Sequence, residues 1–470
     1  MKINFIRLIL LNLALGITLF VVWLIWQTQY LRPAGDDYCY GAITAEYGVL
    51  GGVVHWWNSW SGFIYAMFSG NLFVGFPLAS LPLSTASAIP FVLTAFGISC
   101  TFILLQKNAV LNFYSIVQLI PMSMFCWWTF LWASPFINPK ISFLVLFANG
   151  LTFWQTINGQ YVLVIVILLI AFLIIRSKFI NHKKQYAQTM LLVCLLGFIA
   201  GSAGTTLSLS ILLVSICVFF WFGRIFLNQN SNQCRKVESR REMCFWGALF
   251  LFTLISMLFC HIFSPGSYIR TQAISPNLSL SLDRILHIFS STFLEGIKIW
   301  LKSLFNYGAF AILILMTGIY FFYSKVRIID SSEKKLFRTA LFLLGFSLLQ
   351  CLINRFSEEF TYQGYWHFVS PLVCTFLSLL LFGASLGLYL GKLQDKFLVK
   401  TLFCLMFLLC LWIGVSANLL MVKAINSRYI TWIQGPALAD GISDISDPNG
   451  WEMGCWNRLN GMRPSPTPRL

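Results

Sequence analysis

Two adjacent carboxylates, Asp36 and Asp37, are the residues of this sequence best suited to chemistry. They lie near the start of a polar stretch, residues 32–60, in a chain with only 16 Asp and Glu residues among 470. A carboxylate in a partly desolvated place can take a proton from a hydroxyl group and so act as a general base. The alternative is a solvated turn, because Asp is also favoured in loops and at helix N-caps.

The composition indicates which kind of protein holds this pair. Hydrophobic residues make up 58% of the chain and charged residues 10%, against about 45–50% and 25% in soluble domains. Apolar runs recur along the chain, and those of about 18 residues or more are long enough to cross the hydrocarbon layer as helices. We therefore expect an all-α polytopic membrane protein, integral to the membrane and multi-pass.

Eleven transmembrane helices are predicted, with a cytoplasmic N-terminus and an external C-terminus. They are residues 1–27, 88–105, 113–132, 161–175, 187–203, 207–222, 245–263, 307–323, 340–353, 368–390 and 402–422. Every inner loop then carries Lys or Arg, as the positive-inside rule requires. The transmembrane domain covers residues 1–423, with large outer loops at 28–83 and 264–302, and residues 424–470 form a short external tail.

Three stretches outside these spans are less regular. Residues 42–60 combine helical apolar spacing with glycines and tryptophans, which predicts one or two helices lying in the membrane interface. Residues 63–83 and 133–160 are apolar but contain Gly and Pro. We expect the first to be partly re-entrant or interfacial and the second to be a re-entrant or surface helix, both on the outer side, and whether either one spans the membrane stays open.

This topology places the unusual polar residues on one side of the membrane. Beside the Asp pair, the candidates for binding a substrate or a phosphate are Arg270, Arg355, Arg428, His367, Trp154 and Tyr161. Arginine can hold two anionic oxygens at once, so a base and several arginines predict a site for an anionic substrate. Each also has a structural alternative: arginines snorkel, tryptophans form interface belts, and Arg355 has Glu358 and Glu359 nearby.

Other kinds of chemistry have less support. Five scattered histidines show no metal-binding spacing, so no metal ligand is assigned, although a divalent cation remains possible. The net charge is +16, but no basic face or known module accompanies it, and no nucleic-acid partner is expected. Most of the 13 cysteines lie in apolar runs, whereas Cys39 and Cys455 both fall on the predicted outer side and could pair.

An enzyme that works outside the membrane needs a substrate delivered there. Transfer of a sugar from a polyprenyl phosphate fits, because an Asp can activate the acceptor hydroxyl while cations stabilise the departing lipid phosphate. The prenyl tail needs an apolar groove, which apolar helices can supply. The predicted partners are thus a polyprenyl-phosphate sugar donor, a glycan or lipid acceptor, and membrane lipids.

Short motifs in the outer segments resemble the GT-C superfamily of polytopic membrane glycosyltransferases, in particular bacterial O-antigen glucosyltransferase-like and related uncharacterised proteins. The matching text is Asp36-Asp37-Tyr38 after the first span, WQTINGQY at residues 154–161, and Pro265-Gly266 followed by Arg270. The resemblance implies a GT-C fold and a catalytic acid in the Asp pair, with Asp36 favoured. It also implies a role in building cell-envelope glycans such as the lipopolysaccharide O-antigen, in the bacterial inner membrane with a periplasmic or external active site.

The sequence also departs from these relatives. Trp60-Ser61-Gly62 is followed by Phe63 where relatives often have a basic residue, and GSAGTTLS at residues 201–208 lacks the usual acid. These differences bear on acceptor contacts and on metal ligation. The competing hypotheses are a transporter or flippase of a lipid-linked glycan, which needs charges at mid-span, an O-antigen-ligase-like enzyme, and a purely structural membrane protein.

Overall fold

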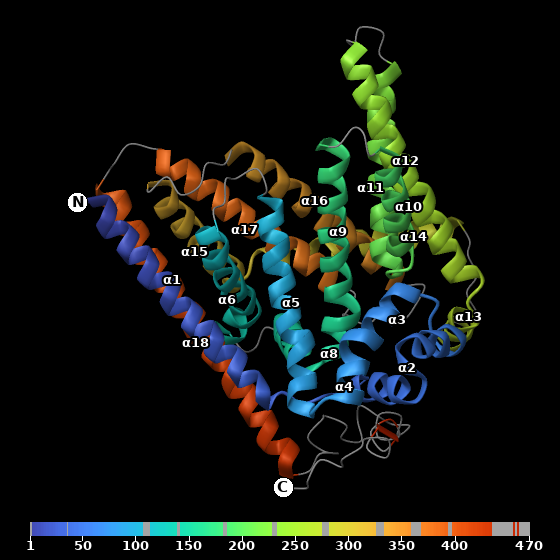
Figure 1. Ribbon diagram of the computed structural model, residues 1–470, viewed down its shortest axis with the longest axis horizontal. Coiled ribbons are helices and arrows are strands. Elements are labelled where there is room, and N and C mark those ends of the chain that lie inside the picture. Colours follow the sequence, from blue (N-terminus) through green and yellow to red (C-terminus); the bar gives the residue numbers. More distant parts are fainter. Residues whose placement is uncertain are drawn as a thin grey trace.

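The computed structural model describes residues 2–34, 36–106, 113–138, 142–181, 186–227, 233–274, 282–325, 333–358, 368–392, 397–434, 455 and 458–459. Within these residues all regular structure is helical and no strand occurs, which confirms the all-α prediction. Figure 1 shows the shorter helices of residues 37–80 (α2, α3 and α4) at the lower right and the long helices above them and to their left.

Eight helices of the described chain are long and apolar enough to cross a membrane. They are α1 (Lys2–Gln27), α5 (Leu83–Leu105), α9 (Leu163–Asn181) with the turns before it, α11 (Thr205–Leu227), α12 (Gln233–Ile262), α16 (Glu333–Glu358), α17 (Val369–Lys392) and α18 (Phe397–Gln434). The end of α14 (Leu282–Leu304) and α15 (Tyr307–Lys325) form a pair bent by 49°, which raises the number to nine if it is one span. The chain thus has the helices of a multi-pass membrane protein.

The other predicted spans are helical but do not meet the same test. Residues 113–132 lie in α6 (Phe113–Ile137), and residues 187–203 correspond to α10 (Tyr186–Gly201), which is a shorter apolar helix of 16 residues. Residues 307–323 are the second arm of the bent pair. The count of eleven and the orientation therefore remain predictions.

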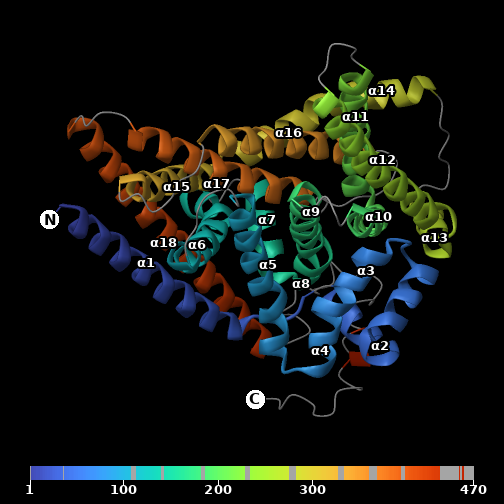
Figure 2. The same cartoon turned by 45° about the horizontal axis from the view of Figure 1, so that its top comes forward.

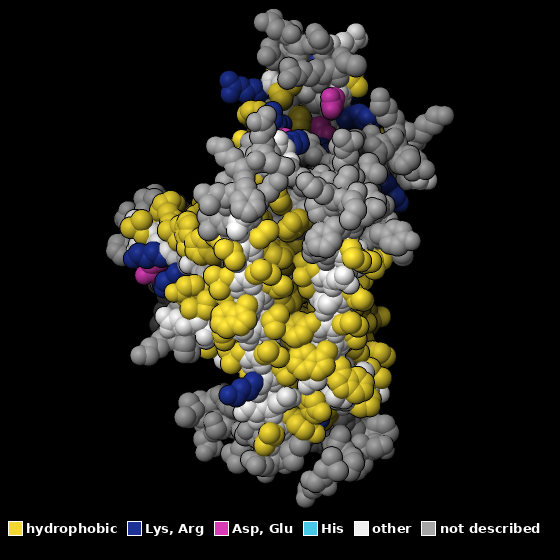
Figure 3. Space-filling model, turned by 90° about the vertical axis from the view of Figure 1, so that its left-hand side faces the viewer, with side chains coloured by type: hydrophobic (Ala, Val, Ile, Leu, Met, Phe, Trp, Pro, Cys, Tyr) yellow, Lys and Arg dark blue, Asp and Glu magenta, His cyan; other side chains and the backbone are white. Residues whose placement is uncertain are grey.

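The surface supports a lipid environment for the long helices. Figure 3 shows a face that is mostly hydrophobic, with Lys and Arg side chains near its margins. On α1 and α18, which come together near Tyr30 and Tyr429, exposed apolar side chains recur, among them Leu15, Leu19, Leu408 and Trp412. Soluble monomers rarely expose so much contiguous apolar area, whereas hydrocarbon solvates it well.

Helix α2 (Asp37–Ser59) is folded into a hairpin at Gly48. Gly48 has φ 70° and ψ 176°, a backbone region that is essentially restricted to glycine. Tyr40 and Trp56 would lie about 24 Å apart in a straight helix, yet their ring centroids are 5.0 Å apart. The start and the end of α2 therefore lie close together. The expected one or two helices in residues 42–60 are present as the arms of this hairpin.

The two ambiguous stretches are interrupted helices. Residues 64–80 form α3 (Ile64–Gly70), a π-helical turn (Asn71–Gly75) and α4 (Phe76–Ser80). Residues 142–162 form α7 (Ser142–Phe153), a break at Trp154, α8 (Gln155–Ile157) and a second π-helical turn (Asn158–Val162) that runs into α9. The first stretch packs against the α2 hairpin, where the Thr44 hydroxyl donates to Asn71 Oδ1 at 3.1 Å.

Most of the predicted loop 264–302 is also helical. It contains α13 (Pro265–Ile274) and α14, and α14 is strongly amphipathic. Helix α16 extends through Glu358 into the predicted loop 354–367, and α18 extends to Gln434, past the predicted end of the last span. Arg355 and Arg428, which the predicted spans leave in the loop and the tail, therefore lie on helices.

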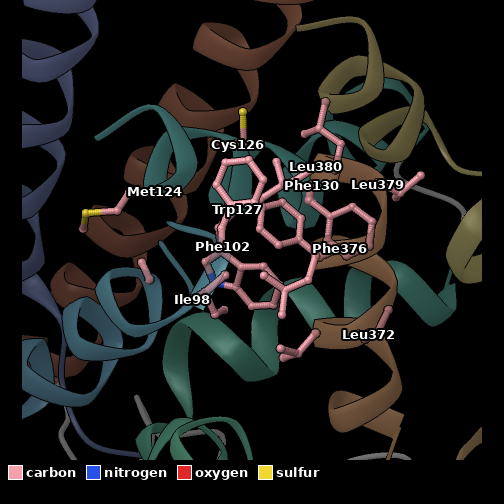
Figure 4. Close-up of a cluster of buried hydrophobic side chains, with 14 of the residues drawn as sticks. Ile98, Phe102, Met124, Cys126, Trp127, Phe130, Leu372, Phe376, Leu379 and Leu380 are labelled. Carbon is pink, nitrogen blue, oxygen red and sulfur yellow. The ribbon is translucent and has the colours of Figure 1, made fainter. Parts of the chain in front are cut away.

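The central core joins α5, α6 and α17. Trp127 packs edge-on against Phe376 with ring centroids 5.0 Å apart, and Phe130 completes the cluster (Figure 4). Helix α17 also approaches α15 closely, because a Cβ at Gly387 would lie 2.4 Å from the Thr317 carbonyl oxygen. Small residues allow such close backbone contact between membrane helices. Figure 2 shows α15, α16 and α17 on the opposite side of this core from α2, α3 and α4.

Candidate functional site

Asp37 is the most completely hydrogen-bonded acid among the described residues. Its Oδ2 accepts the backbone N–H of Ala34 and of Gln155, each at 3.0 Å. Its Oδ1 accepts the backbone N–H and the hydroxyl of Thr156, each at 2.6 Å. The side chain is fully buried. The Asp pair and the WQTINGQY segment, 119 residues apart, are thus directly bonded.

The local backbone explains why Asp37 binds there. Trp154 is extended, with φ −91° and ψ 100°, so a new helical run begins at Gln155 and continues as the candidate span Gln155–Phe179. The first N–H groups of a helix lack partners within the helix and attract negative charge. Asp37 supplies that charge from a distant segment and fixes the break between α7 and α8.

Burial raises the pKa of Asp37 to about 6, while its hydrogen bonds to Thr156, Ala34 and Gln155 lower the pKa and offset part of the effect. Desolvation thus has the largest effect on the pKa of Asp37, although both of its carboxylate oxygens accept hydrogen bonds. A carboxylate with both oxygens occupied has little room for a substrate. This geometry favours a positioning role for Asp37.

Asp36 has a contrasting environment one residue earlier. It stands at the N-cap of α2, makes no capping hydrogen bond, and is exposed. Desolvation nevertheless raises the pKa of Asp36, so protein surrounds the exposed side chain on several sides. Surface exposure is the more direct measure of whether a substrate can reach the carboxyl group. Asp36 is the accessible member of the pair.

Two arginines, Arg428 and Arg32, lie near the two segments that Asp37 joins. The Arg428 guanidinium lies 4.7 Å from the ring centroid of Phe153, two residues before Gln155. Arg32, four residues before Asp36, donates to the carbonyl oxygens of Gln29 and Leu31 and lies 4.4 Å from the ring centroid of Tyr429. Both are partly buried. Aromatic faces hold guanidinium groups in fixed places, so both arginines are held close in the structure to the segments 32–37 and 153–156.

Arg270 belongs to a motif that packs on the other end of α2. Ser264 Oγ donates to the Trp57 carbonyl oxygen at 3.0 Å, and the Gly62 N–H donates to Ser267 Oγ at 3.0 Å. A Cβ at Gly266 would lie 2.5 Å from the Trp60 nitrogen, so only glycine fits this contact. Arg270 lies in α13, and its side chain is outside the described residues.

The remaining predicted site residues divide. Trp154 forms the break beside Gln155, and Tyr161, in the following π-helical turn, is partly buried against the central core. Arg355 lies on α16, where its Nε donates to Glu295 Oε2 of α14 at 2.5 Å. The side chains of Glu358 and Glu359 lie outside the described residues, and nothing described connects Arg355 with the Asp pair. His367 lies outside the described residues.

The sequence interpretation missed several residues of this region. Arg32 was passed over, and Thr156 was seen only as part of a motif. Residues Cys455, Arg458 and Leu459 also pack on the first arm of α2, through a Cys39–Cys455 disulfide, an Arg458–Glu46 ion pair and contact of Leu459 with Gly41. The possible pairing of Cys39 with Cys455 followed from their predicted outer position and is confirmed, whereas the contacts of Arg458 and Leu459 were missed.

Metal binding has no evident site in the described part of the chain, where no three His, Cys, Asp or Glu side chains cluster as potential ligands. Two carboxylates, one of them saturated by hydrogen bonds, form a poor site for a divalent cation, which prefers six or more oxygens. Comparisons with protein-family models, with curated proteins and with solved structures find no match to this chain.

Proposed function

We propose that this chain is a membrane glycosyltransferase of the GT-C type. It moves a sugar from a polyprenyl phosphate to a hydroxyl group of an envelope glycan or lipid. One observation carries the proposal: the Asp pair is divided into a buried acid that holds the backbone and an accessible acid beside it. An enzyme that uses a carboxylate base needs both, a reactive group and a rigid support for it.

In the proposed reaction Asp36 takes the proton of the acceptor hydroxyl. The acceptor oxygen forms the new bond to the anomeric carbon, and the bond from that carbon to the lipid phosphate breaks. The phosphate leaves with the electron pair, and arginine neutralises the charge that develops on it. Arg428 and Arg32 are the described candidates, and Arg270 remains a candidate on the strength of its motif. The raised pKa of Asp36 makes it a stronger base than an Asp with the ordinary pKa.

Two features support an outer position for this site. The disulfide between Cys39 and Cys455 suits an oxidising compartment, since thiols in the cytosol stay reduced. The Lys- and Arg-rich segments, by contrast, connect the opposite ends of the long helices, and such segments are typically cytoplasmic. A bacterial inner membrane with the site on its periplasmic face fits both features.

The test uses the full-length protein in liposomes with a panel of polyprenyl-phosphate hexoses and extracted envelope acceptor. Sugar transfer and movement of the donor across the bilayer are both measured. The expected result is transfer that Asp36→Asn lowers by about a hundredfold to ten-thousandfold. Glu46→Gln is the matched control, because Glu46 lies on the same arm of α2 and pairs with Arg458. Donor movement without transfer would instead support a flippase.

A further inference from the structure

An apolar groove lies far from the Asp pair, between the α14–α15 bend and helices α16 and α17. Its volume is about 710 Å³, within the range of small-molecule sites. Most of its lining is hydrophobic, from side chains such as Phe305, Phe310, Leu313, Phe382 and Leu386. The bend of 49° between α14 and α15 separates the helices enough to leave this space.

One end of the groove is basic. Lys334 and Arg338 line it together with Glu333, and the Glu333 carboxylate is engaged by Lys392 at 2.6 Å. Lys334 and Arg338 are exposed, and among the described residues Arg338 has no ion-pair partner. Positive charge therefore exceeds negative charge at this mouth, while the interior is apolar.

The basic end and the Asp pair lie on opposite sides of the helix layer. At the far end of α16, Asn354 contacts the Thr206 hydroxyl, next to the turn where the Ser202 carbonyl oxygen accepts the N–H of Tyr65 in α3. Helix α3 packs with α2 around the Asp pair. From Glu333 to Asn354 the helix rises about 32 Å, which is about the thickness of a hydrocarbon layer.

We propose that this groove binds an anionic phospholipid, with an acyl chain between α15, α16 and α17 and its phosphate on Lys334 and Arg338. Charge complementarity at the mouth selects an anionic headgroup, and the apolar interior selects a hydrocarbon chain. The position excludes the sugar donor of the proposed reaction, whose headgroup must lie at the Asp pair in the other leaflet. The site therefore does not depend on the proposed function.

The test is native mass spectrometry of the full-length protein, delipidated and titrated with dioleoyl phosphatidylglycerol or dioleoyl phosphatidylcholine. One phosphatidylglycerol is expected to bind in preference to phosphatidylcholine. Each basic residue near a membrane surface contributes roughly a fivefold gain in binding, so Lys334→Gln with Arg338→Gln should weaken the binding of phosphatidylglycerol by roughly thirtyfold.

Two further variants make the result specific. Lys335→Gln removes a neighbouring exposed charge that does not line the groove, and it should leave binding unchanged. Leu386→Trp fills the groove from its partly exposed wall and should displace the lipid without touching the basic end. Equal binding of both phospholipids, unchanged binding by the double variant, or displacement of phosphatidylglycerol by a polyprenyl phosphate would overturn the proposal.

Discussion

The start of α2 and the contact between α14 and α16 offer an instructive comparison. Both contain acidic and basic residues that the sequence placed on the same outer face. In the first, Asp37 is completely buried and accepts four hydrogen bonds. In the second, Arg355 and Glu295 form an ion pair whose side chains remain 24% and 50% exposed. The two contacts therefore differ in burial: the buried Asp37 holds two segments together, whereas the exposed ion pair is an ordinary surface contact.

Burial also distinguishes the residue that stabilises the protein from the residue that a substrate can reach. Donors left unsatisfied in a buried place each cost about 1–3 kcal/mol, whereas an exposed ion pair contributes about 1 kcal/mol or less. Asp37 should therefore govern stability, and Asp36, which makes no capping bond, should not. The following predictions test this division, from the largest effect to the smallest.

Asp37→Ala should lower the free energy of unfolding by about 3–5 kcal/mol, because it leaves the N–H groups of Ala34, Gln155 and Thr156 and the Thr156 hydroxyl without their acceptor. Denaturant unfolding in detergent micelles measures the change. Asp36→Ala is the control and should change the free energy by less than about 1 kcal/mol. Equal effects of the two variants would contradict the division.

The stability of the protein should depend on pH through Asp37. Its pKa is about 6 in the folded protein, above the ordinary value of 3.8, so folding favours the protonated form. The contribution is fully present below about pH 4, is lost as the pH rises through about 6, and amounts to about 3 kcal/mol for a shift of about two units. The difference in the free energy of unfolding between the wild type and Asp37→Asn, measured from pH 4 to pH 7, isolates the contribution of Asp37. If the wild type became more stable relative to Asp37→Asn as the pH rises, the predicted pH dependence would be contradicted.

Gly48→Ala should cost about 2 kcal/mol, since an alanine would be strained at φ 70° and ψ 176° although nothing lies within 4 Å of its Cβ. Thermal unfolding measures the loss. Gly16→Ala is a suitable control, because Gly16 has equal space and no positive φ. If Gly48→Ala left the unfolding temperature unchanged, the hairpin of α2 would not require the positive φ of Gly48.

Arg355→Ala should change the free energy of unfolding by less than about 1 kcal/mol, because the ion pair with Glu295 is open to solvent. A double-mutant cycle with Glu295→Gln measures the pair alone. A coupling of several kcal/mol would place Arg355 in a buried network and remove the contrast with Asp37.

Much of the helical framework could be predicted from the sequence because hydrocarbon imposes a local, readable requirement on each span. Residues 161–175 and all of 368–390 but its first residue, for example, fall within helices that are long and apolar enough to span a membrane. The helix in the predicted loop 264–302 was missed for the same reason. An amphipathic segment such as α14 has too many polar residues to resemble a span and too little turn chemistry to be recognised as a surface helix.

The candidate site was predictable only in part. The Asp pair stood out by its rarity, and its shared side with residues 154–161 followed from topology. The bond from Asp37 to Thr156 did not, because a contact across 119 residues leaves no periodic pattern. The contact of Arg355 with Glu295, 60 residues away, was not visible in the sequence for the same reason. The sequence therefore identified the candidate residues, and tertiary packing distinguishes the positioning residue Asp37 from the accessible carboxylate of Asp36.

The most direct measurement of the central claim compares Asp36→Asn and Asp37→Asn in one reconstituted preparation. Both the rate of sugar transfer per folded protein and the unfolding temperature are recorded. We predict that Asp36→Asn keeps the wild-type unfolding temperature and loses transfer, whereas Asp37→Asn unfolds at a lower temperature. An Asp36→Asn protein that transfers sugar at the wild-type rate would contradict the assignment of Asp36 as the base.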